Sequence, residues 1–204
     1  GYLMSKEPLP EETKVGFWSS PDIAGDPLFF IREDEAPAAK ANLLFTPQTA
    51  PDLRGASGEM VYELGRDFTW APGSREIVLT EKSRIPFKTV AELHPAPGSP
   101  NSYDGFRDTK WHMLYAQGRF FHDLQSVATY TASKPWPSSV PVAKPDQLSH
   151  LHARLAAHES VKVVVLGDSI STGLNASATG HVSPYQPGYP ELVTLSLLHL
   201  PRCR

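Results

Sequence analysis

Three residues near the end of this 204-residue chain have the types and order that nucleophilic catalysis needs. Gly167, Asp168 and Ser169 directly follow the apolar run VKVVVL (161–166). A side chain just after a buried strand is rigid at its base and exposed at its tip, where open α/β sheets bind ligands. Gly167 lets the backbone turn there without a clash from a Cβ atom. We therefore expect Ser169 to present its hydroxyl to the crevice with its own N–H nearby, and a backbone N–H beside a nucleophile is half of an oxyanion site.

A structural role is the alternative for these residues. Asp and Ser are common helix caps, because their side chains accept hydrogen bonds from the N–H groups of a first turn. Asp168 and Ser169 would then simply cap a helix and carry no chemistry.

The eight histidines offer no clear base for the Gly-Asp-Ser serine. His150 and His152 lie two apart on a predicted helix, so their side chains point to different faces. His181 lies in the loop after the serine and could approach it, but no acid partner can be assigned, and an exposed loop histidine is the simpler interpretation. His122 and Asp123 are the only adjacent His-Asp pair, and in the strand predicted there they would lie on opposite faces.

The segment VVVLGDSISTG (163–173) resembles the first sequence block of the GDSL, or SGNH, hydrolase family. YQPGYPELV (185–193) is similar to the loop and first helix that commonly follow this block. The resemblance implies that Ser169 is the nucleophile and an oxyanion donor through its N–H. It also implies supporting roles for Gly167, Asp168 and Gly173.

The family resemblance also implies a reaction and its partners. It points to hydrolysis of a small ester or an acylated carbohydrate by a serine nucleophile, with no metal or other cofactor. A β-rich module ahead of the hydrolase is similar to what some bacterial carbohydrate esterases carry, which makes an extracytoplasmic location one option. The alternative function is a non-catalytic carbohydrate- or ligand-binding β-sandwich module with a vestigial hydrolase segment.

The chain departs from the family after the nucleophile. The family's Gly-x-Asn-Asp and Asp-x-x-His blocks, which supply an oxyanion Asn and the triad acid and base, do not follow Ser169 in these residues. We therefore expect an N-terminal fragment of a hydrolase, or a product with an altered C-terminus. A serine without a base is a weak nucleophile, so we expect little or no esterase activity from these residues alone.

The elements that must position these residues are of two kinds: short strands of antiparallel type before about residue 132, and helices with a parallel-type strand after it. This change predicts an α+β chain in two parts. Residues 1–26 read as an irregular arm, and 27–132 as an antiparallel β-sandwich or jelly-roll-like domain, because short strands alternate with Pro/Gly turns. Residues 133–158 are a linker and a helix. Residues 159–204 are the start of an α/β/α, flavodoxin-like SGNH domain, because the uninterrupted Val/Leu run is typical of a buried parallel strand.

Several segments carry the individual signals. The clearest is a hairpin at 67–80, whose strands flank the turn Ala71-Pro72-Gly73-Ser74. The other predicted strands are PLFFIRE (27–33), ANLLFT (41–46), EMVYEL (59–64), KWHMLYA (110–116) and RFFHDLQSVATYTA (119–132).

Two helices and a set of aromatic residues complete these expectations. A helix over about 146–158 would be capped by Asp146 and would align Leu148, Leu151 and Leu155, and a last helix would run from Pro190 to before Pro201. Large aromatic side chains dominate the interiors of β-sandwiches, so we expect four aromatic residues of the β-rich part to lie in its core. The alternative is that these four residues form a surface on which sugars stack. This group consists of Phe68, Trp70, Trp111 and Tyr115.

Composition excludes several classes of partner. The formal net charge is -3, which gives no basic face for nucleic acid. No run of 18 apolar residues is present, so no membrane span is expected. The single cysteine, Cys203, allows neither an intramolecular disulfide nor a thiolate zinc cluster. The oligomeric state stays open.

Overall fold

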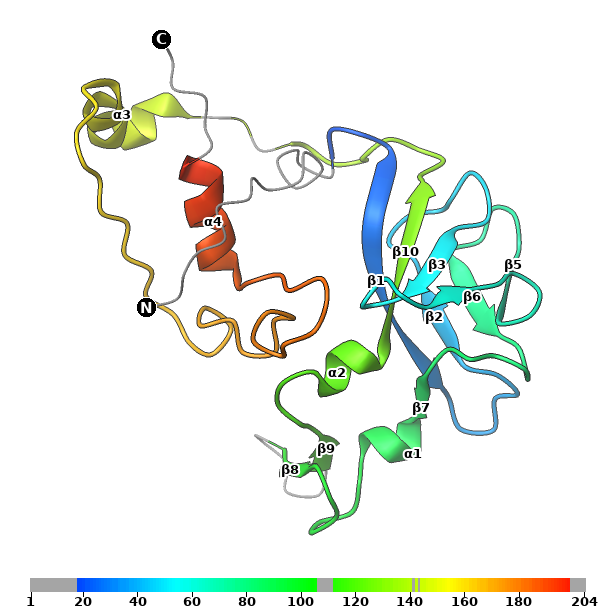
Figure 1. Ribbon diagram of the computed structural model, residues 1–204. Helices are drawn as coiled ribbons and strands as arrows, with labels where there is room; N and C mark the ends of the chain where they lie inside the picture. The colour runs from blue at the N-terminus through cyan, green and yellow to red at the C-terminus, as the bar shows by residue number, and fades with distance from the viewer. Residues whose placement is uncertain (1–17, 106–111, 141, 143, 199–204) are drawn as a thin grey trace.

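The computed structural model describes residues 18–105, 112–140, 142 and 144–198 (Figure 1). Its regular structure is mostly β, and most of it lies before residue 132. The strands are β1 (Asp22–Arg32), β2 (Lys40–Asn42), β3 (Asp52–Gly55), β4 (Val61–Tyr62), β5 (Phe68–Trp70), β6 (Glu76–Leu79), β7 (Phe87–Thr89), β8 (Ser102–Asp104), β9 (His112–Leu114) and β10 (Gln125–Thr131). The helices are α1 (Val90–Leu93), α2 (Phe120–Asp123), α3 (Ser149–Ala156) and α4 (Tyr189–Leu198), with a 3-10 turn at Pro145–Leu148.

Eight of the strands form one curled, nearly closed sheet in the order β4-β3-β10-β1-β2-β6-β5, with β7 beside β1. Every pair in it is antiparallel except β1 with β7. The long strand β1 joins the two halves: its residues up to Phe29 pair with β10, and Phe30–Arg32 pair with β2 and β7. Strands β8 and β9 form a separate two-stranded sheet. The expected antiparallel, β-rich part is therefore present.

The main hydrophobic core is formed by this sheet and the loops that connect its strands. Its buried residues lie between Ile23 and Ala132, and they alternate along the strands because successive side chains of a strand point to opposite faces. Asp26 is one of the buried polar residues. It accepts hydrogen bonds from the Tyr130 hydroxyl at 2.8 Å and from the Leu44 N–H at 2.7 Å. Burial raises the pKa of Tyr130, so its hydroxyl keeps its proton.

The predicted hairpin at 67–80 is confirmed. Strands β5 and β6 pair with Phe68 opposite Leu79 and Trp70 opposite Ile77. Gly73 takes a φ of +83° in the connecting turn, a region that favours glycine.

The segment predicted as one strand at 119–132 is different at its start. Residues Phe120–Asp123 form the short helix α2, and the strand begins only at Gln125. The helical turn brings Arg119 and Asp123 together, with Nε and Nη2 donating to the carboxylate at 2.7 and 3.0 Å. His122 and Asp123 are thus not on opposite faces of a strand, and His122 Nδ1 lies 3.8 Å from Asp123 Oδ1.

The N-terminal boundary is also earlier than predicted. Strand β1 begins at Asp22, inside the segment expected to be an irregular arm, and residues 1–17 of that arm lie outside the described residues. Strands β3 and β7 were not predicted, because DLRG and FKT are short and partly charged and have no apolar run. Their pairing partners, β10 and β1, supply the stabilisation that the local sequence lacks.

The prediction of a buried parallel strand at 161–166 is wrong for this structure. These residues have no regular secondary structure and their side chains are exposed, Leu166 to 99%. A parallel strand needs neighbouring strands for its backbone groups and covering helices for its faces, and no described residue pairs with this segment. An α/β/α sheet is therefore not seen in the described part of the chain.

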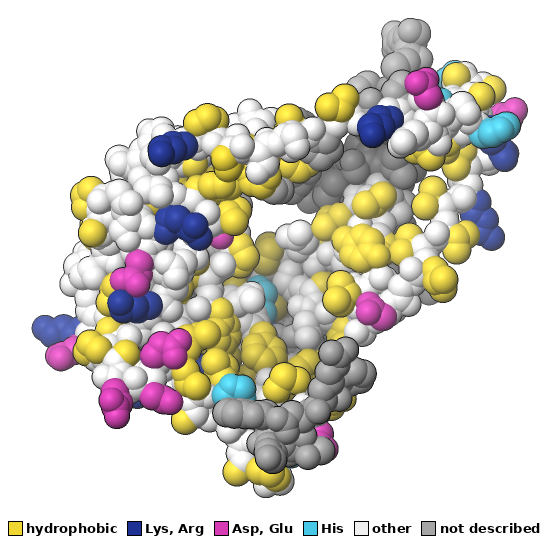
Figure 2. Space-filling model, turned by 180° about the vertical axis from the view of Figure 1, so that it is seen from behind, with side chains coloured by type: hydrophobic (Ala, Val, Ile, Leu, Met, Phe, Trp, Pro, Cys, Tyr) yellow, Lys and Arg dark blue, Asp and Glu magenta, His cyan; other side chains and the backbone are white. Residues whose placement is uncertain are grey.

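The two predicted helices of the C-terminal part are present. Helix α4 begins at Tyr189, one residue before the predicted Pro190, and its predicted end lies outside the described residues. Helix α3 begins at Ser149 without a side-chain cap, so the expected capping by Asp146 is wrong. Leu148 and Leu155 stay exposed, because α3 contacts no core. Figure 2 shows hydrophobic side chains on the surface of the molecule, the C-terminal part included.

Candidate functional site

The Gly-Asp-Ser segment forms a tight, internally bonded turn. Asp168 Oδ1 accepts a hydrogen bond from the Ile170 N–H at 3.0 Å, and the Asp168 carbonyl accepts from the Thr172 N–H at 3.1 Å. The Ser169 carbonyl accepts from the Leu174 N–H at 3.0 Å and from Thr172 Oγ1 at 2.8 Å. The backbone on both sides of Ser169 is thereby held in place.

The reactive groups of Ser169 itself are free within the described residues. Its side chain is exposed, and neither its hydroxyl nor its N–H makes a hydrogen bond to another described residue. A fixed backbone with an open hydroxyl and an unused N–H is the arrangement that a nucleophile and oxyanion donor require. Asp168 accepts from an N–H two residues on, but no helix begins there, so the alternative of a helix cap is not seen; Ser169 contributes only its carbonyl to the turn.

Gly167 is required by a close approach of Ser171. A Cβ built on Gly167 would lie 1.9 Å from Ser171 Oγ, so any other residue would displace that hydroxyl. The Ser171 hydroxyl in turn forms a 2.8 Å hydrogen bond with the hydroxyl of Tyr189, the first residue of α4. Gly167 therefore allows the turn to be tied to the start of the helix.

Gly173 makes a second close approach to the same region. It has a φ of +77°, and its backbone touches that of Gly188: a Cβ on Gly188 would lie 2.9 Å from Gly173 Cα. The two segments that carry the family resemblance, 163–173 and 185–193, are thus in direct contact. Sequence analysis named Gly173 but missed the role of Gly188.

The loop that contains this turn also contacts the β-rich part. Asn175 Oδ1 accepts a hydrogen bond from the Gly118 N–H at 2.9 Å. A Cβ on Gly180 would lie 3.3 Å from the backbone of Arg119, so these two segments of the chain pack closely just before α2. In Figure 1 this orange loop lies beside α2. The motif segment is therefore placed against the β-rich part.

No histidine is brought to Ser169 within the described residues. His181 is exposed and has a φ of +52°, and its N–H donates to Ala178. His150 and His152 are exposed on α3. The base that would activate Ser169 is thus not found among the residues that the structure describes, where no cluster of three or more His, Cys, Asp or Glu suits a metal ion either.

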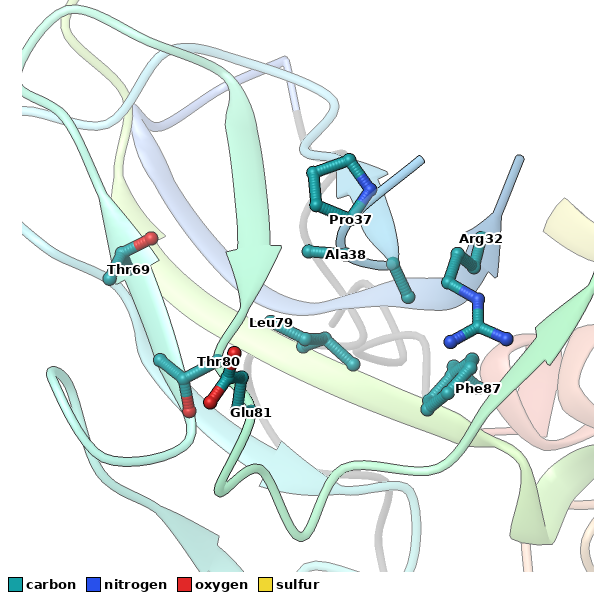
Figure 3. Close-up of a pocket in the computed structure, with 9 residues that line it drawn as sticks. Arg32, Pro37, Ala38, Thr69, Leu79, Thr80, Glu81 and Phe87 are labelled. Carbon is teal, nitrogen blue, oxygen red and sulfur yellow. The ribbon is translucent and has the colours of Figure 1, made fainter. Parts of the chain in front are cut away.

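A second feature of the β-rich part is an open cavity of about 500 Å³ (Figure 3). On one side, the Arg32 guanidinium carbon lies 5.3 Å from the centre of the Phe87 ring, a cation-π arrangement. On the other side lie Thr69 and Thr80, with Leu79 between the two sides. Arg32 makes no ion pair with another described residue.

The aromatic residues singled out from the sequence do not line this cavity. Phe68 is buried in the core and Trp70 packs against it, which confirms the expected core role for both. Tyr115 is half-buried against Phe121, and Trp111 lies outside the described residues. Phe87, which the sequence analysis did not select, is the aromatic residue at the cavity, and only its tertiary position reveals it.

Comparisons of this chain with protein-family models, with curated proteins and with solved structures found no significant match. No helix of the described chain combines the length and apolar character that a membrane span needs.

Proposed function

We propose that this chain carries the nucleophile segment of an SGNH-type serine ester hydrolase, with Ser169 as the nucleophile. The observation that carries the proposal is the turn itself: Ser169 is exposed with an unused N–H, while its backbone is fixed on both sides. The contact of Gly173 with Gly188 supports it, because it joins the two segments that resemble the family. The proposed substrate is a small ester, such as an acylated carbohydrate.

In the proposed reaction the Ser169 oxygen attacks the acyl carbon, and a tetrahedral intermediate forms. The Ser169 N–H donates to the oxyanion, and collapse of the intermediate releases the alcohol and leaves an acyl-serine that water hydrolyses. A base must take the serine proton in the first step. The proposal assigns this base and its acid partner to residues other than those described, since no described side chain hydrogen-bonds to the Ser169 hydroxyl.

Hydrolysis of p-nitrophenyl acetate tests the proposal. We expect no Ser169-dependent turnover from the 204 residues alone, and turnover only where further sequence supplies the base and its acid partner. Ser169→Ala should abolish the latter activity, whereas Ser138→Ala, a change at an exposed linker serine, should leave it intact. Undiminished steady-state turnover in Ser169→Ala, beyond the single equivalent of p-nitrophenol that acylation of another serine would release, would rule out Ser169 as the nucleophile.

The cavity beside Arg32 favours a second candidate function, a ligand-binding β-rich module. Its volume of about 500 Å³ falls within the range of small-molecule sites, and it combines an aromatic ring, a cation and hydroxyl groups. In this reading the β-rich part is a jelly-roll-like sandwich that binds carbohydrate, and the segment after 159 is vestigial.

Binding to acylated polysaccharides distinguishes this second function. Phe87→Ala and Arg32→Ala should each weaken binding by about tenfold, because each removes one half of the stacked pair. Arg54→Ala serves as control, since Arg54 is an exposed arginine paired with Asp52. Equal binding by all three variants would place the ligand elsewhere.

A further inference from the structure

The small hairpin of β8 and β9 brings a serine, a histidine and an aspartate together, away from the Gly-Asp-Ser turn. Ser102 and Asp104 lie two apart on β8, so their side chains share a face. His112 on β9 is directly opposite Asp104 in the register. A hairpin of three residues on each strand thus places all three side chains side by side.

The three side chains form a continuous hydrogen-bonded chain. Ser102 Oγ lies 2.7 Å from His112 Nδ1, closer than the Pro95 carbonyl oxygen at 3.4 Å, which competes for the same hydroxyl hydrogen, and His112 Nε2 lies 3.1 Å from Asp104 Oδ1. A carboxylate only accepts hydrogen bonds, so in the neutral ring Nε2 carries the proton and Nδ1 presents its lone pair to the serine hydroxyl. The tautomer that a general base needs is therefore selected by Asp104.

The surroundings hold the imidazole in place. Only 14% of the His112 side chain is exposed, while the Asp104 side chain is 69% exposed to solvent. The His112 carbonyl is 3.1 Å from His94 Nδ1, which joins β9 to the end of α1. A nucleophile next to a base that a third group orients is the general pattern of an activated serine.

We propose that Ser102 is a second nucleophile of this chain and that activated esters acylate it. Its hydroxyl oxygen forms a bond to the acyl carbon, and the bond from that carbon to the leaving alkoxide breaks. The hydroxyl proton passes to His112 Nδ1, and the imidazolium, paired with Asp104, returns it to the leaving group or to water. This inference is independent of the role proposed for Ser169.

One feature of the hairpin limits this chemistry to acyl transfer onto the serine. The Ser102 N–H donates to the Ser99 carbonyl at 3.2 Å, so it is not available to an oxyanion. Without that donor we expect reaction with good leaving groups only, and slow release of the acyl group. Ser102 should therefore accumulate as an acyl adduct.

Mass spectrometry of peptides after brief treatment with p-nitrophenyl acetate tests the proposal within the unmodified protein. Ser99 is the internal control, because it lies three residues before Ser102 and its hydroxyl donates to the Ala96 carbonyl without a histidine. We expect acetylation of Ser102 about a hundredfold faster than of Ser99, the usual contribution of a general base. Equal rates at the two serines would overturn the proposal without any variant.

Variants separate this site from Ser169 and from a purely structural role. The adduct should persist in Ser169→Ala and disappear in Ser102→Ala. His112→Ala should slow it about a hundredfold, and added imidazole should restore part of the rate, which a structural histidine would not do. Asp104→Asn should slow acetylation with an unchanged circular dichroism spectrum. Loss of the adduct in Ser169→Ala, or full rates in His112→Ala, would contradict the assignment.

Discussion

The backbones of Gly173 and Gly188 are in direct contact, and this contact joins the Gly-Asp-Ser turn to the loop before α4. A Cβ on Gly188 would lie 2.9 Å from Gly173 Cα and 3.1 Å from its nitrogen, closer than real Cβ atoms approach. Ser171 and Tyr189 bridge the same two segments by a hydrogen bond. The position of Ser169 thus depends on residues that lie well after it in the chain.

Substitution of Gly188 by alanine should therefore open this turn. The new methyl group can be accommodated only by separating the two backbones, which frees the amides of 168–176 from their mutual hydrogen bonds. We expect faster hydrogen exchange in that segment and unchanged exchange in the main sheet. Gly55→Ala is the control, because its Cβ would meet its neighbours at an ordinary 3.5 Å. Unchanged exchange at 168–176 in Gly188→Ala would contradict the described contact.

Asn175 should control how the motif loop attaches to the β-rich part. Its side-chain oxygen accepts the Gly118 N–H, and its φ of +65° is one that asparagine tolerates better than most residues. Asn175→Ala removes the acceptor and strains the backbone, whereas Asn175→Gly removes the acceptor without strain and Asn175→Asp keeps an acceptor. The protection of the Gly118 amide against hydrogen exchange should fall in the first two variants and persist in the third. Equal protection in all three would show that the contact is not needed.

The ion pair of Asp67 with Arg84 should be a main contributor to the stability of the sheet. Asp67 is fully buried and accepts hydrogen bonds from the Arg84 Nη2 at 2.6 Å, the Arg84 Nε at 3.0 Å and the Glu63 N–H at 2.8 Å. Asp67→Asn should lower the free energy of unfolding by about 3 kcal/mol, the low end for a broken buried pair, because Arg84 is partly exposed. Asp52→Asn, which breaks an exposed pair with Arg54, should cost less than about 1 kcal/mol. Urea unfolding measures both, and equal effects would contradict the burial argument.

The same pair predicts how stability depends on pH. The hydrogen bond from Arg84, together with those from backbone N–H groups, holds the pKa of Asp67 below its ordinary value despite burial. In the unfolded chain an aspartate takes up its proton near about pH 4, so the stabilisation is complete above that pH and is lost progressively as the pH falls below it. Asp67→Asn lacks this contribution, so its stability should fall less steeply between about pH 4 and about pH 2. Parallel slopes for the two proteins would rule out the effect.

Limited proteolysis should divide the chain after the β-rich part. Arg154 and Lys162 are exposed and neither is followed by proline, α3 buries no residue, and no regular structure follows it before the motif. Trypsin should cut first at these sites and leave a resistant product that retains β1 to β10, because backbone opening is least costly where few contacts hold the chain. First cuts between Asp22 and Thr131 would contradict this picture of stability.

Local patterns were sufficient for several features. The hairpin of β5 and β6 and the start of α4 depend on residues close in the sequence, where turn chemistry and periodicity act directly. The run VKVVVL shows the limit of such patterns: it predicts a strand, but a strand forms only where another strand accepts its backbone hydrogen bonds. For the same reason β3 and β7 were not predicted: their sequences have only a weak local preference for strand, and pairing with β10 and β1 stabilises them.

The sequence by itself determined that the chain has an antiparallel β-rich part, and it singled out Ser169, Gly167 and Gly173. Tertiary structure decided the contacts between distant residues. Asp26 and Tyr130 meet across 104 positions of sequence, and Gly118 meets Asn175 across 57. The juxtaposition of Ser102 with His112 likewise depends on the strand register of a hairpin that the sequence did not predict. Such pairs are decided by which strands and loops pack together, because side-chain chemistry alone does not specify which of many possible partners will be adjacent in space.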